Sequence, residues 1–404
     1  MPSETKRALN GVLRIFRPRV LLFIVAMSSF TVTHAANRYW VASAFSNWNN
    51  TQNWSTTSGG SAGASVPGSG DVAIFDNNST VSCTIDATVN VSSITVNSGY
   101  TGAIAQGSNA ITVSGAATFS SGTFTGGTAN VTVSGVFTLA GTAFTSTSGI
   151  LELRSNAAFS SGSFAHNNGT VRFNGSGSVS ITGTSPSLYT LEFVGNACTY
   201  TLSSVGSIAV VNSLNLTGSL FYTLLTGSIS VTGDINSSNT ATGCGGDATV
   251  SIVGTGTENF SGSSVAGGGD LPQLVINKPG GTLNLTNYPG VSNNFTYTAG
   301  SIAPGTSTFC FTHGNAGSYT VSGNLTLANL EFYINISLLT VTIPTLTATG
   351  NLTIAGAGSV LINTGSINLN GNLTLTNTGA GGGGTGSINF AAAARRLRME
   401  RPLR

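Results

Sequence analysis

Charged side chains are scarce in this chain. Of its 404 residues only 6% are Asp, Glu, Lys or Arg, whereas about a quarter is usual for a globular protein. The polar surface must therefore consist of hydroxyl, amide and backbone groups, supplied by Ser, Thr, Asn and the 54 glycines. Between residues 36 and 390 there are only four basic and ten acidic residues, a net charge of −6. A nucleic-acid partner needs clustered Lys and Arg on a folded surface, so the composition excludes that class.

Long apolar runs and cysteine pairs are missing too. Beyond the first forty residues no stretch approaches the roughly 18 apolar residues that span a bilayer, so we predict no membrane span once the N-terminal segment is removed. No CxxC pair occurs, which excludes the usual zinc motifs. Export would permit disulfides in any of three pairings, but we favour four buried, unpaired thiols. The cysteines are Cys83, Cys198, Cys244 and Cys310.

The N-terminus has the pattern of an export signal. A basic segment precedes the apolar run VLLFIVAMSSFTV (20–32), and small residues follow at Thr33 and Ala35. This pattern predicts a signal peptide over residues 1–35, with cleavage after Ala35 or Ala36. An uncleaved anchor is the alternative, and the short apolar core argues against it. In either case we expect the body to be secreted or on the cell surface.

A repeat of twenty residues runs through the first half of the body. ITVSGAATFSSGTFTGGTAN (111–130) is followed in register by VTVSGVFTLAGTAFTSTSGI (131–150), and the spacing continues to residue 210. Apolar and polar positions alternate, which is typical of strands. Gly, Ser, Thr and Asn would interrupt any amphipathic helix. The first apolar column of the repeat is Ile111, Val131, Leu151, Val171 and Leu191.

Each unit is too small to bury its apolar side alone, and stacking the units solves this. We therefore predict an all-β fold, a right-handed parallel β-helix (β-solenoid) with coils of about 20 residues and an N-terminal aromatic cap. Dividing the body by the period gives about sixteen to eighteen coils and a rod of about 80 Å. One column, Phe124, Phe144 and Phe164, should form a ladder of rings in the core. Another should hold Phe119, Leu139, Phe159 and Val179.

Two further sets of residues follow from this stacking. Glu152, Arg172 and Glu192 fall between inward columns, so we predict an outer ladder with neighbours about 4.8 Å apart. All three tryptophans, Trp40, Trp48 and Trp54, precede the first coil. Because an open strand end templates aggregation, we predict that they cap the core. A carbohydrate-stacking platform is the alternative.

The predicted organisation has four parts. A signal peptide (1–35) precedes the cap segment (36–70) and the solenoid (71–390). The final segment (391–404) is basic and breaks both the period and the composition. We favour a truncated or out-of-frame end there over a basic tail that binds the envelope.

The opening of the body resembles a known class of proteins. YWVASAFSNWNNTQNWSTTSGGSAGASVPGSGDVAIFD (39–76), TVNVSSITVNSG (88–99) and the recurring GNLTL strands are similar to secreted bacterial β-helical surface proteins of the adhesin and autotransporter-passenger type. The resemblance implies a stalk or adhesive surface outside the cell envelope. It predicts no anchoring route, because neither a translocator-barrel pattern nor a sorting tail is found.

Catalytic groups are thinly spread. The enzymes that this shape suggests, β-helical polysaccharide lyases and hydrolases, need carboxylates or bases on neighbouring coils. Asp71, Asp76 and Asp86 are the closest acidic group and are candidates for a calcium ion, although solvated turn aspartates are the favoured interpretation. His166 and His313 are lone histidines in turns. We therefore predict no enzyme activity and no cofactor.

Three functions remain as hypotheses. The favoured one is a secreted or cell-surface structural or adhesive solenoid, with extracellular glycans or the surfaces of host or neighbouring cells as partners. The first alternative is a polysaccharide-active enzyme or carbohydrate-binding module. The second is an ice- or surface-binding solenoid, which needs a flat threonine array. Thr112 and Thr132 begin such an array, but the charged ladder ends it. The oligomeric state is not predicted.

Overall fold

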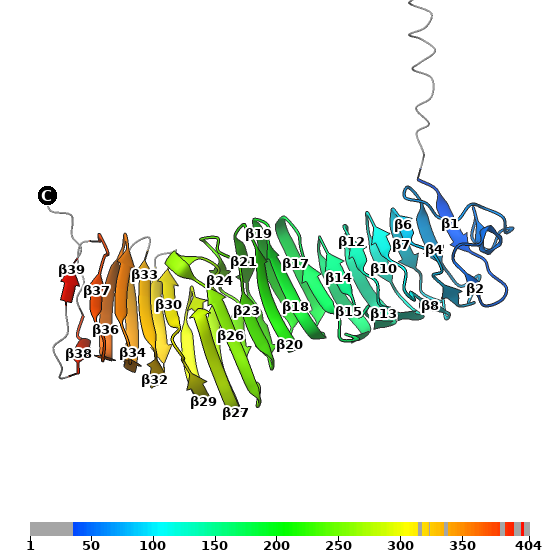
Figure 1. The fold of residues 1–404 in the computed structure, drawn as a ribbon. Helices are drawn as coiled ribbons and strands as arrows, with labels where there is room; N and C mark the ends of the chain where they lie inside the picture. The colour runs from blue at the N-terminus through cyan, green and yellow to red at the C-terminus, as the bar shows by residue number, and fades with distance from the viewer. Residues whose placement is uncertain are drawn as a thin grey trace, which may run out of the picture.

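The computed structural model describes residues 35–313, 317–322, 324–334, 338–379, 384–391 and 397–399. They form an elongated β-solenoid of parallel stacked coils with about 14 turns, 59% strand and 2% helical (Figure 1). The predicted solenoid fold is therefore confirmed. The predicted signal peptide, apart from Ala35, and most of the predicted basic tail lie outside the described residues.

Three sheets form the walls of the solenoid. The N-terminal sheet contains β1 (Asn37–Trp40), β2 (Ser46–Asn47), β3 (Trp54–Ser55), β4 (Val72–Phe75), β5 (Cys83–Thr84), β7 (Ser93–Val96), β8 (Ala103–Ala105), β10 (Ala117–Phe119), β11 (Thr123–Thr125), β13 (Phe137–Thr145), β15 (Ala157–Ala165), β17 (Gly177–Thr184), β19 (Cys198–Val205), β21 (Tyr222–Leu225) and β24 (Gly245–Gly246).

The long sheet runs along most of the solenoid, from residue 89 to residue 390. Its strands are β6 (Val89–Val91), β9 (Ile111–Val113), β12 (Val131–Val133), β14 (Ile150–Leu153), β16 (Thr170–Phe173), β18 (Ser187–Gly195), β20 (Ser207–Gly218), β22 (Ser228–Val231), β23 (Asp234–Ser237), β25 (Thr249–Ile252), β26 (Thr257–Ser263), β27 (Gln273–Tyr288), β29 (Phe295–Ala303), β31 (Gly317–Ser322), β32 (Leu325–Leu327), β34 (Leu338–Ala348), β36 (Ser359–Leu369) and β38 (Ser387–Phe390).

The C-terminal sheet begins beyond the end of the N-terminal one. It contains β28 (Gly290–Val291), β30 (Thr308–His313), β33 (Asn329–Ile334), β35 (Leu352–Gly356), β37 (Leu373–Leu375) and β39 (Leu397–Met399). Two short 3₁₀ helices complete the described elements, η1 (Thr51–Asn53) and η2 (Val265–Gly267). Of the strand pairs in the described residues, β1–β3 is antiparallel and the others are parallel.

Successive coils pair in the register that the repeat predicts. The column from Ile111 to Leu191 advances by twenty residues at each step. Later coils are longer, since Leu191 pairs with Leu214 and Phe295 with Val321. With these longer coils the body makes about 14 turns, fewer than the sixteen to eighteen predicted. At about 4.8 Å per coil the rod is about 65 Å long.

Alternating side chains explain the core. In each short strand the apolar residues point inward and are buried, while the intervening Ser and Thr stay partly exposed. The column predicted to run from Phe119 to Val179 is wrong at Val179. Phe159 faces Gly183 in the next coil, and Val179 instead pairs with Tyr200. The reason is a four-residue lengthening of the coil before Ile181, which pairs with Ala157.

Glycine permits close contact between coils at the repeated SG corner. Gly115 and Gly135 lie in consecutive coils, and a Cβ atom on Gly135 would sit 2.5 Å from the carbonyl carbon of Gly115. Any larger residue would force the two coils apart. A different corner is held by asparagines of the GN motifs. The Oδ1 atom of Asn351 accepts a hydrogen bond from the backbone N–H of Asn372, 3.0 Å away.

The lateral wall changes from one sheet to the next near residue 265. The N-terminal sheet ends at β24 and the C-terminal sheet begins at β28 (Figure 1). Residues 264–271, which include η2, lie between them, and we call this segment the seam. It is joined to its surroundings by single bridges and backbone hydrogen bonds, such as Leu271 N–H to the Gly290 carbonyl at 3.0 Å.

Candidate ligand-binding pocket

A hollow of about 150 Å³ lies where the phenylalanine ladder ends. Pockets for drug-sized ligands are larger, roughly 300 Å³ or more. Ten residues line it: Leu139, Phe159, Ser161, Gly162, Ser163, Phe164, Thr184, Ser185, Pro186 and Ser187. We call it the Phe164 pocket.

The twenty-residue register builds the aromatic floor of this pocket. Phe124, Phe144 and Phe164 are paired across β11, β13 and β15. Their rings are stacked, with centroids 4.6 Å apart for the first pair and 5.9 Å for the second. Phe159 meets Phe164 edge to face at 5.6 Å. The structure thus brings together the three rings assigned to a core ladder, and Phe164 is only partly buried.

The stack ends because the next coil is longer. β17 pairs with the first three residues of β15, and this pairing stops at Phe159. The chain then turns through residues 184–187, which form the opposite wall of the pocket. Thr184 helps to hold that wall, since its hydroxyl donates a hydrogen bond of 2.9 Å to the Phe159 carbonyl.

The rim of the pocket is polar but uncharged. Ser161, Ser163 and Ser187 are exposed, and no ionisable side chain is among the lining residues. Just beyond the two walls, the rings of His166 and Tyr189 lie 5.5 Å apart. A site of this kind can offer hydroxyl donors and acceptors. None of the ten lining residues carries an ionisable side chain for acid–base catalysis.

The predicted tryptophan cap is a buried cluster. Trp40, Trp48 and Trp54 are at most 2% exposed and pack with Phe75. The indole N–H of Trp54 donates to the Trp48 carbonyl at 2.8 Å. These rings fill the N-terminal end of the core. The alternative of a carbohydrate-stacking platform is wrong for these residues, because no indole face is open.

The three aspartates considered for calcium do not form a site. Asp71 accepts hydrogen bonds from the backbone N–H groups of Ala36 and Gly68, at 3.2 and 2.9 Å. Asp86 accepts one from Asn49 N–H at 2.8 Å. Asp76 is buried and accepts from the Ser58 hydroxyl at 2.6 Å.

Each of these carboxylates thus holds a different loop, and the calcium alternative finds no support in their placement. The favoured interpretation, a solvated turn aspartate, is wrong for Asp76, which is buried. Within the described ranges, no group of three or more His, Cys, Asp or Glu side chains is placed to hold a metal ion.

The predicted charged ladder lies on the long sheet as a network of ion pairs. Arg172 pairs with Glu192 at 2.8 Å and with Glu152 at 3.5 Å. Glu152 also binds Arg154 at 2.5 Å, and Glu192 accepts a hydrogen bond from the Thr217 hydroxyl at 2.8 Å. Both glutamates are 9% exposed, so the ladder is less solvated than an outer position suggests. Carboxylates held in this way serve structure.

All four cysteines are buried and unpaired, as the sequence favours. Burial raises the pKa of each thiol, and that of Cys244 rises to about 11. A thiol with a raised pKa is a poor nucleophile and a poor metal ligand. Reactive cysteine chemistry therefore has no support in this geometry.

The seam holds a buried carboxyl group that sequence reasoning missed. Asp270 is 2% exposed, and its carboxyl group accepts a hydrogen bond from the Thr312 hydroxyl. Its backbone carbonyl accepts a bond of 2.6 Å from the Tyr222 hydroxyl. Burial raises the pKa of Asp270 to about 7; the hydroxyls of Thr312 and Ser264 oppose the rise, and Glu331 adds to it.

A buried ion pair was also missed. Lys278 is 1% exposed, and its ammonium group contacts the Glu258 carboxylate and the carbonyls of Gly254 and Gly256, the latter two at 3.0 and 3.2 Å. The NKPGG context indicates a solvated turn. The one signal was that Lys278 is the sole lysine between residues 36 and 390. Neither Lys278 nor Asp270 is accessible to a substrate, so both have structural roles.

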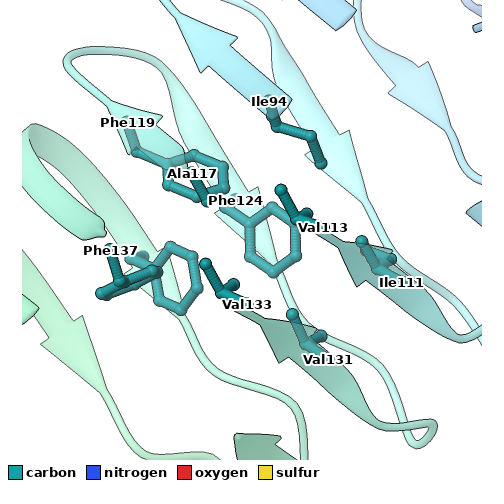
Figure 2. Close-up of a pocket in the computed structure, with 10 residues that line it drawn as sticks. Ile94, Ile111, Val113, Ala117, Phe119, Phe124, Val131, Val133 and Phe137 are labelled. Carbon is teal, nitrogen blue, oxygen red and sulfur yellow. The ribbon is translucent and has the colours of Figure 1, made fainter. Parts of the chain in front are cut away.

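A second hollow lies inside the core (Figure 2). Its volume is about 10 Å³ and its lining is entirely apolar, including Ile94, Val113 and Phe119. That volume is near the minimum for one water molecule, and no polar group is present to bind one. It is a dry packing defect and carries no function.

Comparison with known proteins returned no match: neither a family model, nor a curated protein, nor a solved structure is similar to the chain. The functional interpretation therefore depends on the sequence pattern and the geometry. None of the helices in the described part of the chain is long and apolar enough to serve as a membrane span.

Proposed function

We propose that this protein is a secreted or cell-surface solenoid with a structural or adhesive role and no catalytic one. The observation that supports this proposal most is an uncharged outer face on the N-terminal sheet. One outward column, in register over six coils, consists of hydroxyl and methyl side chains: Thr95, Thr118, Thr138, Ala158, Thr182 and Ser203.

Such a face suits contact with neutral surfaces. Its side chains are short, so little rotamer entropy is lost on binding. Hydroxyls can both donate and accept hydrogen bonds, and the methyl groups of Thr and Ala add apolar area. The rigid rod would hold this face tens of ångströms from its attachment point. The export pattern at the N-terminus supports the same compartment.

The enzyme alternative has little support from the geometry. Most carboxylates of the described residues are held in ion pairs, in loop hydrogen bonds or in the closed interior. None of them lines the Phe164 pocket.

Two measurements test the proposal with the full chain. In the producing cells, the mature N-terminus should begin after Ala35 or Ala36, and protease added to intact cells should digest the body. Beads coated with the folded chain should adhere to cell surfaces or polysaccharide films more than beads coated with the heat-unfolded chain. A protein that keeps residues 1–35 inside the cell, or equal adhesion by both kinds of bead, would contradict the proposal.

Ice or crystal binding is a second candidate, favoured by the same column. On the long sheet, the threonine column that begins with Thr112 and Thr132 is interrupted in the next coil by Glu152, as the sequence predicts. The column of Thr95, Thr118 and Thr138 on the N-terminal sheet continues without a charge. Thermal hysteresis of the purified chain distinguishes this candidate, because a purely adhesive protein shows none.

A further inference from the structure

We propose that the buried pair of Lys278 and Glu258 is a modification site, at which the two side chains condense to an amide that links neighbouring coils covalently. The ion pair is the state before the reaction. The step is internal to the chain and consumes no co-reactant. It goes beyond the proposed function, since it concerns how the rod is held together.

The two reacting groups lie one coil apart in a core that is otherwise apolar. Glu258 occupies an inward position of β26, where it pairs with Leu283 of β27, and Leu283 pairs in turn with Ile302. The side chain of Lys278, also in β27, is fully buried, and that of Glu258 is 6% exposed. A buried ion pair is often no more stable than an apolar pair of the same volume. Stability alone therefore does not account for two charges at this place.

The atoms that the reaction joins are already in contact. The Nζ atom of Lys278 contacts Oε2 of Glu258, and within the described residues this oxygen has no other hydrogen-bond partner. The second oxygen, Oε1, accepts a hydrogen bond of 3.0 Å from the Gly256 backbone N–H. The carbonyls of Gly254 and Gly256 accept from Nζ at 3.0 and 3.2 Å and so orient the amine. Oε2 is therefore placed to leave and Oε1 to stay.

Both protons that the nitrogen loses can pass directly to Oε2. The ammonium first protonates the carboxylate, which gives a neutral amine beside a neutral acid. Burial favours these uncharged forms and lowers the pKa of Lys278. The lone pair of Nζ then attacks Cδ of Glu258, and the Gly256 N–H stabilises the negative charge that develops on Oε1. The Cδ–Oε2 bond breaks, Oε2 takes a second proton from Nζ, and one water molecule leaves.

The closed interior favours the amide. Two groups held in contact react as if at an effective concentration of about 10⁵–10⁸ M. The product places one neutral amide where two charges were buried, which removes the cost of desolvating them. Its N–H keeps the Gly254 carbonyl as acceptor, and its oxygen keeps the hydrogen bond from Gly256. Each polar atom of the product therefore has a partner.

The link lies where the walls of the solenoid are least continuous. The N-terminal sheet ends at β24 and the C-terminal sheet begins at β28. Between residues 246 and 290, the described strands of successive coils are therefore paired in the long sheet alone, with single bridges beside it. Glu258 and Lys278 both belong to this interval. An amide between them ties the coil of β26 to that of β27.

The test uses the full mature chain, in which Lys278 carries the only ε-amine, because Lys6 lies in the predicted signal peptide. Folded protein dissolved in urea should have a mass lower than that of its sequence by one water molecule. Chymotrypsin, which cuts after Phe260, should release a branched peptide that joins the segments around Glu258 and Lys278. Acetylation in urea should modify the α-amine alone. Chain kept in urea since its synthesis should have the full mass and lose the water only after refolding.

Lys278→Arg is the matched control. It keeps the positive charge, but its guanidinium group has a pKa above about 12 and supplies no free amine. A second control, Lys278→Met combined with Glu258→Gln, removes both charges together and is used if the arginine does not fit. Both controls should have the full mass of their sequences, and thermal melting shows whether each one is folded.

Three outcomes would overturn the inference. These are the full sequence mass in the folded wild type, a loss of water that maps to other residues, or the same loss in a folded control. The second outcome would identify a cyclised aspartate elsewhere in the chain. Export and adhesion are measured separately, so the proposed function can stand if the amide is absent and can fail if it is present.

Discussion

The ring of Phe124 lies nearly parallel to that of Phe144, with centroids 4.6 Å apart and an angle of 11°, although twenty residues separate them. This contact can form only if one full coil advances the chain by one strand spacing. The same register places Thr125 beside Thr145 on the outer face. One period thus orders both the core and the surface.

Truncation in the middle of this stack should be costly. Phe144 is 2% exposed and contacts rings on both sides. We expect Phe144→Ala to lower the free energy of unfolding by about 3–5 kcal/mol. Phe164→Ala should cost about half as much, because one side of the ring already faces the pocket. Urea unfolding followed by circular dichroism measures both, with the outer-face variant Thr138→Ala as control. Equal losses for Phe144 and Phe164 would contradict the arrangement.

The first half of the solenoid could be predicted because its period is constant. Between Ile111 and Leu191 no residue is inserted in that column, so every member stacks on the one before. The ion pairs of Arg172 follow from the same register. The lengthened coil before Ile181 could not be located, since residues 174–180 are mainly Gly and Ser and mark no single insertion point. The pocket is a consequence of that lengthening and was missed with it.

The buried polar groups were missed for a different reason. Asp is a routine turn residue, and a single sequence does not show which turns are covered by other coils. Asp270 is covered because the wall changes sheets at the seam. For Asp71, Asp76 and Asp86, closeness in sequence suggested a cluster, but each corner of a solenoid points in a different direction. A spacing of one full period therefore predicts which side chains stack in a column. Closeness in sequence within one coil does not predict which side chains meet.

The tryptophan cap should give a clear spectroscopic signature. All three indoles are at most 2% exposed, so the native emission should be blue-shifted and poorly quenched by acrylamide. Trp54→Ala should cost about 3–5 kcal/mol and promote self-association through the opened strand end. Light scattering and quenching measure the two effects. Native emission at the wavelength of free indole in water would show that the cap is open.

The charged ladder should contribute more than a single surface pair. Arg172→Met leaves Glu192 without its cation, and we expect a loss of about 1–2 kcal/mol in unfolding free energy. The loss should shrink in 1 M NaCl, where the Debye length is about 3 Å. Arg38→Met is the control, since Arg38 and Asp71 are 3.9 Å apart, and it should cost less than about 1 kcal/mol. A loss for Arg172→Met that is independent of salt would indicate packing in place of charge.

The buried pair of Lys278 and Glu258 should be strongly coupled. Lys278→Met leaves a carboxylate in the closed interior, which costs about 3–5 kcal/mol. Adding Glu258→Gln removes that charge and should restore a large part of the loss. Urea unfolding of the two single variants and the double variant gives the coupling energy. Simple additivity of the two single losses would mean that the charges do not depend on each other.

Loss of the Asp270 proton should make the seam less stable as the pH rises. The pKa is about 7 in the folded protein, raised by burial from an ordinary value of 3.8. Between these values the folded protein holds a proton that the unfolded chain releases. The free energy of unfolding therefore falls as the pH rises from about 4 to 7, and then levels off. The full change is roughly 4 kcal/mol at most.

Asp270→Asn isolates this effect. The amide oxygen can still accept from Thr312, but the side chain no longer titrates. Hydrogen exchange of the amides in residues 264–271 at pH 5 and pH 8 should show faster opening at pH 8 in the wild type, after correction for intrinsic exchange. In the variant the two rates should be nearly equal. Burial also raises the pKa of Glu331. Because Glu331 is present in both proteins, it adds the same small pH dependence to the opening rate of each. Slower opening of the wild-type seam at pH 8 would mean that Asp270 is ionised in the fold.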